Sequence, residues 1–213
     1  MSTSSLPQDH HRRFLNRYYG ISKHIYDLTR KYYLFGRDQV LNSLTQDPSW
    51  QTLIEMGTGT GRNLKVLHKK RPHSTLGGFD ASDEMLTLAQ KQCPWGTFAH
   101  AFAEDADYTQ LFQCTPDRIL FSYCLSMFLK PREALENAYR QLAPNGRIEV
   151  VDFADLNNTP WFFRIPMKEG LLKTFHVQPL EQGLFHNLPH HVCFGPGRYF
   201  LKATLTKPCP NTH

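Results

Sequence analysis

A run of closely spaced glycines, EMGTGTG at residues 55–61, constrains the fold of this chain more than any other feature. It follows the short apolar segment 52–56 and precedes a segment with helical spacing, 62–70. Glycine adopts the sharp turn that such a junction needs, and it lets a ligand approach the backbone. The helix after it would present free N–H groups to that ligand. The sequence therefore predicts a strand, a ligand-binding loop and a helix in succession.

Strand-like and helix-like segments alternate after Pro48. Strand, helix and strand in succession form right-handed crossovers, which place helices on both faces of a parallel sheet. Ser82 is the expected N-cap of the second helix, while Pro131 and Gly146 bound the third. Two final strands flank a Gly-Pro-Gly turn. We expect strands over 52–56 and 74–80, a strand and turn over 97–105, and strands at the start of 117–128, over 146–155 and twice within 191–207. Helices are expected over 62–70, 81–93 and 131–146.

The first 47 residues have a different pattern, and we divide the chain accordingly. Residues 1–9 are expected to form a flexible tail, 10–47 a helical lid and 48–213 the ligand-binding domain. Apolar residues recur in the lid at steps of three and four, as on one face of a helix. The opposite side carries tyrosines and arginines, which indicates a ligand-contacting face or, alternatively, a solvated or interdomain one. Its members are Tyr19, Tyr26, Arg30, Tyr33 and Arg37.

The glycine spacing excludes two common nucleotide-binding loops. The dinucleotide fingerprint G-x-G-x-x-G, counted from Gly57, needs its third glycine where Arg62 stands. A phosphate-binding P-loop needs G-x-x-x-x-G-K-S/T, and Arg62 breaks that pattern as well. The loop is therefore not expected to hold a dinucleotide or a nucleoside triphosphate.

Glu55, two residues before the first glycine, makes the loop resemble the first motif of the class I S-adenosylmethionine-dependent methyltransferases. The resemblance implies an α/β, Rossmann-like fold with a mostly parallel seven-stranded sheet, here with an N-terminal helical extension. It also implies that the loop cradles the amino-acid part of S-adenosyl-L-methionine, the methyl donor, whose product is S-adenosyl-L-homocysteine. On this basis the cofactor residues are Glu55, Gly57, Thr58, Gly59, Gly61, Asn63, Ala81 and Ser122.

Residues after the second and third predicted strands extend this cofactor set. Asp80 ends the second strand, where an acidic side chain accepts ribose hydroxyls in related sheets; alternatively, it caps the next helix. Glu104, Asp105 and Ala106 resemble the element that reads the adenine edge, with Asp105 at the exocyclic amine and the Ala106 N–H at the ring nitrogen. Met85 packs on the adenine face or, equally, in the core.

Five stretches resemble a narrower group, the N-methyltransferases of bacterial betaine-lipid synthesis. The resemblance implies three methyl transfers to the amine of diacylglyceryl-homoserine. Thr58 departs from it, because related proteins more often have cysteine or another small residue there, and nothing after His176 matches. The stretches are HIYDLTRKYYLFGRD (24–38), GTGRNL (59–64), DRILFSYCLSMF (117–128), VDFAD (151–155) and FHV (175–177).

Methyl transfer to an amine is an in-line displacement, so the protein must align the amine and handle its proton. Ligands bind beyond the carboxyl ends of parallel strands, which would place Ser122, Tyr123 and Asp152 near the amine. Asp152 is the first candidate for orienting the amine. Tyr123 and His176 are the other catalytic candidates, with a core tyrosine and a structural histidine as alternatives.

The lid stripe has a role in this chemistry. Ring faces attract sulfonium and quaternary ammonium groups, so Tyr19, Tyr26 and Tyr33 would wall the methyl site. Arg30 or Arg37 would pair with a carboxylate of the substrate or the cofactor, or else solvate a helix end.

A diacyl substrate has to be reached at a membrane. The net charge of +5 permits an anionic partner without requiring one. We expect a cytoplasmic protein at the inner face of the membrane, with no leader and no spanning helix. A mixed segment suits the membrane interface or, alternatively, covers the sheet edge. It places Phe162, Phe163, Ile165, Leu171 and Leu172 among Arg164, Lys168 and Lys173.

Three other functions stay open from the sequence. One is N-methylation of a small soluble amine or amino acid, and another is non-enzymatic binding of S-adenosylmethionine. Nucleic-acid methylation fits the pI near 9.0, but the Pro-Pro-aromatic element of base-amine methyltransferases is replaced by FSYCLSM. No metal is expected, because Pro189 separates His186 from His190 and His191, and five cysteines without a C-x-x-C pair indicate reduced thiols.

Overall fold

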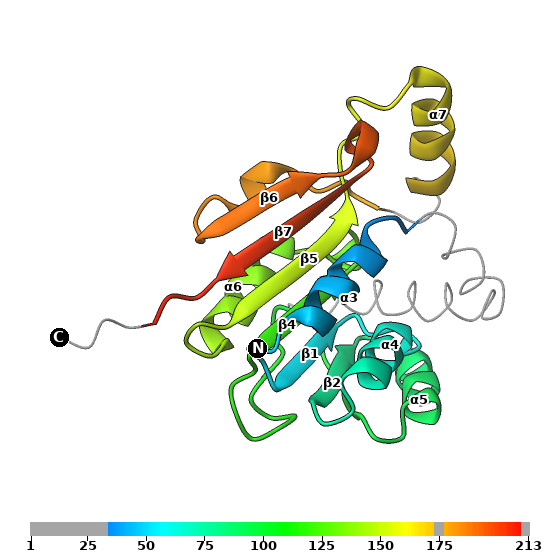
Figure 1. Cartoon of the computed structure of the whole chain (residues 1–213). Coiled ribbons are helices and arrows are strands. Elements are labelled where there is room, and N and C mark those ends of the chain that lie inside the picture. Colours follow the sequence, from blue (N-terminus) through cyan, green and yellow to red (C-terminus); the bar gives the residue numbers. More distant parts are fainter. Residues whose placement is uncertain (1–33, 173–176, 210–213) are drawn as a thin grey trace, which may run out of the picture.

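The computed structural model describes residues 34–172 and 177–209. Its centre is a seven-stranded sheet in the order β3-β2-β1-β4-β5-β7-β6 (Figure 1). The strands are β1 (Thr52–Met56), β2 (Thr75–Asp80), β3 (Thr97–His100), β4 (Arg118–Ser122), β5 (Arg147–Phe153), β6 (His190–Phe194) and β7 (Phe200–Thr206). The helices are α3 (Arg37–Gln46), α4 (Arg62–Lys70), α5 (Asp83–Gln92), α6 (Pro131–Gln141) and α7 (Trp161–Pro166). Helix α7 continues into a π-helical segment, Met167–Leu172. Short 3₁₀ turns span Leu125–Met127, Gln182–Phe185 and Pro196–Arg198.

The direction of the strands determines where a ligand can bind. Strands β1 to β5 run parallel, and β7 is antiparallel to both β5 and β6. Chain order reverses between β1 and β4, because β2 and β3 lie beyond β1 while β5 lies beyond β4. Ligands of open α/β sheets bind beyond the carboxyl ends of the strands at such a reversal. The glycine loop follows β1 and therefore lies there.

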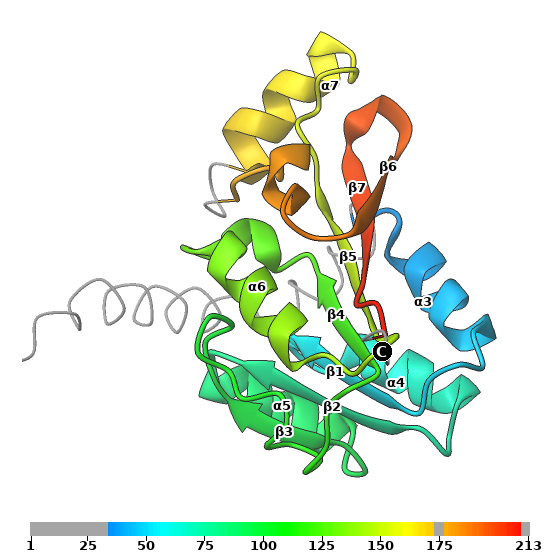
Figure 2. The same cartoon turned by 90° about the vertical axis from the view of Figure 1, so that its left-hand side faces the viewer.

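Helices cover both faces of the sheet, as the sequence predicts. Figure 2 shows α6 on one face and α3 and α4 on the other. Helix α4 packs through Leu64 and Leu67, three residues apart and both buried. The predicted α/β fold is confirmed. No helix in the described ranges is long and apolar enough to cross a membrane.

The caps predicted from the sequence are present. The Ser82 hydroxyl accepts the Met85 N–H at 3.4 Å, so Ser82 is the N-cap of α5. Pro131 is the first residue of α6, where its missing N–H has no intrahelical partner to lose. The alternative considered for Asp80, that it caps α5, is wrong, because Ser82, the predicted cap, takes that position.

The structure divides one predicted segment and shortens one predicted helix. Within the strand and turn expected over 97–105, strand β3 ends at His100, because its partner β2 ends at Asp80, which pairs with His100. The third predicted helix ends at Gln141 rather than near Gly146, and the next residue is already extended, with ψ 144°. Pro144 follows closely and disfavours helical geometry in the residue before it.

Gly36 fixes how the chain enters α3 above the sheet. It has φ +80°, and a Cβ built on it would lie 2.3 Å from Cε2 of Phe200 in β7. The Tyr123 hydroxyl, after β4, donates to the carbonyl oxygen of the neighbouring Phe35. The residues just before α3 are thus held over the carboxyl end of β4 and the amino end of β7, where Phe200 lies.

A buried arginine on β4 holds the segment that connects α3 with β1. Nη2 of Arg118 donates to Oδ2 of Asp47 and to Oγ of Ser49, each at 2.7 Å, while its Nη1 bonds the Asp117 carbonyl at 2.8 Å. Burial by itself would raise the pKa of Asp47, but hydrogen bonds from Ser49 and Arg118 lower it by more. The pKa of Asp47 therefore lies well below its usual range. The carboxylate therefore stays charged opposite the guanidinium.

We expect Arg118→Met to lower the free energy of unfolding by about 3–5 kcal/mol, because it strands Asp47 beside an apolar side chain. Arg147 offers a matched control: its Nη1 is 3.7 Å from the same Asp47 oxygen, but its side chain is 46% exposed. Arg147→Met should therefore change stability by less than about 1 kcal/mol. Urea unfolding of both variants measures the difference. Equal losses of unfolding free energy in the two variants would show that the burial of Arg118 does not make its ion pair with Asp47 more stabilising.

Candidate functional site

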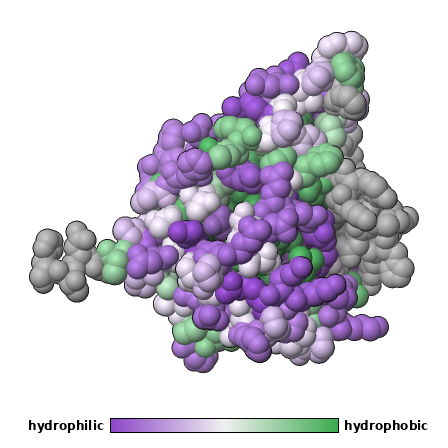
Figure 3. Space-filling view, in the orientation of Figure 1, coloured by the Kyte–Doolittle hydropathy of each residue, from purple (hydrophilic) through white to green (hydrophobic). Residues whose placement is uncertain are grey.

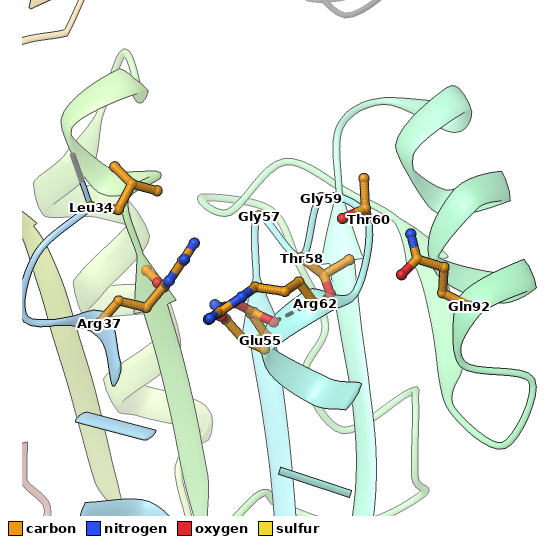
Figure 4. A pocket seen from close by; sticks show the side chains of 11 residues that line it. Leu34, Arg37, Glu55, Gly57, Thr58, Gly59, Thr60, Arg62 and Gln92 are labelled. Atoms are coloured by element: carbon orange, nitrogen blue, oxygen red, sulfur yellow. Dashed lines mark hydrogen bonds between the residues drawn. The ribbon is translucent and has the colours of Figure 1, made fainter. Parts of the chain in front are cut away.

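A pocket of about 190 Å³ opens at the reversal point of the sheet (Figure 4). Its walls come from the glycine loop, the end of β4, the starts of α3 and α4, and the last residue of α5. The segment around α3 and the end of α5 lie on opposite sides of it (Figure 4). The lining residues are Leu34, Arg37, Glu55, Gly57, Thr58, Gly59, Thr60, Arg62, Asn63, Gln92 and Ser122.

The loop backbone needs glycine at three positions. Gly57, Gly59 and Gly61 have φ of +68°, +55° and +80°, a region that side chains with a Cβ rarely adopt. A Cβ on Gly57 would also lie 2.6 Å from Cβ of Cys124, which follows β4. The N–H groups of Gly57 and Thr58 both donate to the Phe79 carbonyl oxygen, at 2.8 and 3.0 Å. The loop is therefore held between β2 and the turn after β4.

Glu55 supplies a buried carboxylate at the floor of the pocket. Nδ2 of Asn63 donates to its Oε1 at 2.6 Å, and the Thr58 hydroxyl lies 3.5 Å from its Oε2. Arg62 in turn donates to Oδ1 of Asn63 at 3.2 Å and to Oδ1 of Asp38 at 3.0 Å. These contacts orient Glu55 and Asn63, both predicted site residues, toward the pocket that they line.

Asp80 stabilises the loop from behind. Its Oδ2 accepts the Gly59 N–H at 2.8 Å, and its Oδ1 accepts the Ser82 N–H at 2.9 Å. Asp80 is buried at the end of β2 and does not line the pocket wall. Its structural role is thus visible, and its assignment to the ribose stays a prediction.

The predicted adenine residues lie further from the pocket. Met85 is buried in α5, and the Ala106 carbonyl accepts hydrogen bonds from Asn137 and Gln141 on α6, both at 2.9 Å. These contacts are part of the packing between α6 and the segment after β3. None of the residues Ala81, Met85, Glu104, Asp105 and Ala106 lines the pocket.

Ser122 and Tyr123 turn the chain at the end of β4. The Ser122 hydroxyl is buried, lines the pocket and has no hydrogen-bond partner among the described residues. Tyr123 has φ +55°, its ring is buried, and its hydroxyl donates to the Phe35 carbonyl. Ser122 is therefore available to a ligand, whereas Tyr123 holds the residues before α3.

Asp152 lies within β5, whereas the sequence led us to expect it just after the strand. It is fully buried: its Oδ1 accepts the Ser126 hydroxyl at 2.5 Å, and its Oδ2 accepts the Ser126 N–H at 3.0 Å. Burial raises the pKa of Asp152 to about 6, although hydrogen bonds from Ser126 and Phe153 lower it. The carboxylate does not line the pocket; it supports the turn that carries Ser122 and Tyr123.

Arg37 is the member of the predicted lid stripe that the structure describes. It is 8% exposed and lines the pocket beside Leu34 (Figure 4). Four other predicted substrate residues, Tyr19, Tyr26, Arg30 and Tyr33, lie outside the described residues, as does the catalytic candidate His176.

Four lining residues were missed by the sequence analysis. Thr60 and Arg62 belong to the loop and the first turn after it, so their position was a usable signal. Leu34 and Gln92 carry no such signal, because their place depends on how α3 and α5 pack. Within the described part of the chain, no three His, Cys, Asp or Glu side chains are grouped to hold a metal ion.

Comparisons with known proteins identify the family of this chain. A family model described as "Methyltransferase domain" matches residues 26–203. The chain is 26% identical to the demethylmenaquinone methyltransferase of Thermotoga maritima, over 75% of this chain and 69% of that protein. It is 27% identical to the tRNA N(3)-methylcytidine methyltransferase of Schizosaccharomyces pombe, over 79% of this chain but only 57%, just over half, of that protein.

Solved structures share the fold. The plantazolicin methyltransferase BamL, in complex with a triazolic desmethylPZN analog and SAH, superposes with a TM-score of 0.70 at 14% identity, over 92% of this chain and 95% of that one. The seven-stranded sheet is thus that of a known methyltransferase architecture.

The pocket fits S-adenosylmethionine, the group that the loop motif implies. Burying the Ser122 hydroxyl without a hydrogen-bond partner costs about 1–3 kcal/mol. A polar ligand that forms a hydrogen bond with this hydroxyl removes that cost. The Glu55 carboxylate and the Arg37 guanidinium complement the ammonium and the carboxylate of an amino acid. Because Gly57, Gly59 and Gly61 have no side chains, a ligand can approach the backbone of the loop closely.

We expect Gly57→Ala to weaken S-adenosylmethionine binding by about tenfold or more, because alanine is strained at φ +68° and meets Cys124. Gly183→Ala is the control, since its φ lies outside the left-handed region and the nearest atom to the new Cβ is 3.9 Å away. Isothermal titration calorimetry measures both affinities. Wild-type affinity in Gly57→Ala would contradict the role of the loop.

The raised pKa of Asp152 predicts a pH dependence of stability. The folded state holds the proton of Asp152 up to about pH 6, whereas the unfolded chain releases it near 3.8, the ordinary pKa of an aspartate. Stability from this group is therefore present at low pH and lost as the pH rises through the folded pKa. Relative to Asp152→Asn, the wild type should lose about 1 kcal/mol of unfolding free energy between about pH 5 and pH 7. Denaturant titrations at both pH values test this, and parallel pH dependence in the two proteins would contradict it.

Proposed function

We propose that this chain, which belongs to the methyltransferase-domain family and is an S-adenosylmethionine-dependent methyltransferase, methylates the amine of a lipid headgroup. The headgroup proposed is that of diacylglyceryl-homoserine, and the product is a betaine lipid. The support from sequence is the resemblance of residues 24–38 and 117–128 to N-methyltransferases of betaine-lipid synthesis. The acceptor would be reached at the inner face of a membrane.

A row of aromatic rings carries the proposal, and two of its members directly follow the pocket-lining residues Ser122 and Leu34 in the chain. Tyr123 and Phe153, at the ends of β4 and β5, have ring centroids 4.8 Å apart. Tyr199 continues the row, 5.9 Å from Phe153 and 5.3 Å from Phe35. Ring faces attract cations by about 0.5–2 kcal/mol, depending on desolvation. A site next to Ser122 with four rings suits an acceptor that becomes a quaternary ammonium.

Residues that line the pocket, together with Asp80 behind the loop, would hold the methyl donor as follows. The loop from Gly57 to Gly61 and the Glu55 carboxylate bind its amino-acid part, while Asp80 serves the ribose. Arg37 pairs with a carboxylate of the donor or of the homoserine headgroup. S-adenosylmethionine supplies an electrophilic methyl group on a sulfonium, whose sulfur keeps the bonding electrons and leaves uncharged.

The acceptor amine must be neutral to form the new N–C bond, and its N–H proton passes to solvent or to a nearby base. Asp152 contributes by positioning: it holds the Ser126 N–H and hydroxyl, and with them the turn after β4 that carries Ser122 and Tyr123. His176 is retained as the candidate for the proton. Because no oxyanion develops, alignment in this turn is the main contribution of the protein.

The proposal is tested by incubating the purified full chain with methyl-labelled S-adenosylmethionine. One set of reactions contains vesicles with diacylglyceryl-homoserine, and another contains free homoserine and small amines without vesicles. We expect label in the mono-, di- and trimethylated lipid, identified by mass spectrometry. Label confined to soluble amines would instead support the alternative, an N-methyltransferase of small soluble amines or amino acids.

A pair of tyrosine variants tests the aromatic row. Tyr199→Leu should lower kcat for amine methylation by roughly five- to tenfold, because one ring face next to the cation is lost. Its affinity for S-adenosylmethionine should stay unchanged, since Tyr199 does not line the pocket. Tyr139→Leu, on α6, is the control, because Tyr139 contacts the Thr206 carbonyl and lies away from the row. Equal rates in the two variants would contradict the cation-stabilising role.

A further inference from the structure

Exposed apolar side chains are distributed unevenly over the described residues. Seven large hydrophobic residues are strongly exposed there, and only Val66 and Trp95 lie away from the carboxyl ends of the parallel strands. The other five belong to segments that follow β4 or β5 or precede α3, at the end where the pocket opens. They are Phe35, Leu129, Trp161, Phe162 and Ile165. Single exposed apolar residues need no explanation, but a gathering at one end indicates contact with an apolar partner.

Helix α7 concentrates this exposure. Trp161, Phe162 and Ile165 are 68%, 55% and 54% exposed within a helix of six residues. The helix projects beyond the sheet at the carboxyl end of β5, as Figures 1 and 2 show from two sides. In the space-filling view, hydrophobic and hydrophilic residues lie side by side at this projecting end (Figure 3). We call Trp161, Phe162 and Ile165, together with Arg164 and Lys168, the α7 edge.

The charges of the α7 edge indicate what kind of surface it contacts. Arg164 and Lys168 alternate with the apolar side chains, and Glu169 is the acidic residue between Trp161 and Leu172. The segment thus carries a net positive charge on a chain of net charge +5. Tryptophan, phenylalanine and isoleucine beside lysine and arginine match the boundary between acyl chains and anionic headgroups. A water-soluble protein partner of ordinary polarity would not require this combination.

We propose that the α7 edge inserts into the interface of a bilayer that contains anionic lipid. Phe35 and Leu129 are also exposed, on segments at the same end of the sheet, and would add apolar contact there. This orientation turns the mouth of the pocket toward the bilayer, so a lipid acceptor enters it without leaving the membrane. The delivery of the acceptor rests on the proposed function; the binding of the bilayer does not.

The test is flotation of the full chain with vesicles that contain no acceptor lipid, either phosphatidylcholine alone or phosphatidylcholine with phosphatidylglycerol. The wild type should partition at least about tenfold more strongly to the anionic vesicles at low salt, and added salt should weaken binding. Trp161→Ala/Ile165→Ala should lower that partition by about tenfold or more, since each lost side chain removes apolar burial. Arg164→Gln/Lys168→Gln should remove the preference for anionic vesicles.

Trp95→Ala/Val66→Ala is the matched control, because it also removes one tryptophan and one aliphatic side chain, 37% and 36% exposed, from elsewhere on the surface. It should bind vesicles within about twofold of the wild type. Thermal unfolding of each variant checks that the fold is retained. A Trp95→Phe background leaves the buried Trp50 and the exposed Trp161, and its tryptophan fluorescence should shift to shorter wavelength on the anionic vesicles as Trp161 leaves water.

Three results would overturn the inference. They are no vesicle binding by the wild type, equal loss of binding in Trp161→Ala/Ile165→Ala and in its control Trp95→Ala/Val66→Ala, and dimerisation through Trp161 that replaces vesicle binding, detected by light scattering. Methylation of a short-chain, soluble headgroup analogue distinguishes this inference from the proposed function. If the analogue is methylated but vesicles are not bound, the membrane inference fails and the amine chemistry stands; if vesicles are bound and no amine is methylated, the reverse holds.

Discussion

Two neighbouring N–H groups of the glycine loop share one acceptor, and the site depends on that arrangement. The backbone N–H groups of Gly57 and Thr58 both point at the Phe79 carbonyl oxygen in β2. On its other side, Gly57 packs against Cys124, which leaves no space for a side chain. The loop is thereby fixed between β2 and the turn after β4. Glu55 consequently faces the pocket, and α4 begins with its N-terminus directed at the same space.

Carboxylates near the loop serve structure and binding together. Asp80 accepts the Gly59 N–H and the Ser82 N–H, so it links the loop to the start of α5. Glu55 similarly holds Asn63 at 2.6 Å while lining the pocket. Removing either charge would therefore alter the loop geometry as well as the ligand contacts.

Local sequence signals predicted most of the fold, and long-range packing accounts for what was missed. The glycine loop, the Ser82 cap and Pro131 at the start of α6 each depend on a few adjacent residues, and each was read correctly. The end of β3 could not be read in this way, because it depends on where its partner strand stops. The sequence also placed Asp152 beyond β5, since nothing near it indicates that Ser126, 26 residues earlier, would bond its carboxylate. Arg37 was found from helical phase alone, whereas Gln92 reaches the pocket only through the packing of α5.

Tyr123 shows how strain in one residue connects the two halves of the site. A bulky side chain at φ +55° costs on the order of 1–3 kcal/mol. The cost is offset by burial of its ring against Phe153 and by its N–H bond to the Val151 carbonyl at 2.8 Å. The turn that results aims the Ser122 hydroxyl into the pocket and carries the Tyr123 hydroxyl to the Phe35 carbonyl. A ligand contact at Ser122 is thus mechanically joined, through one residue, to the segment that brings Arg37 to the pocket, and a change in either is transmitted to the other.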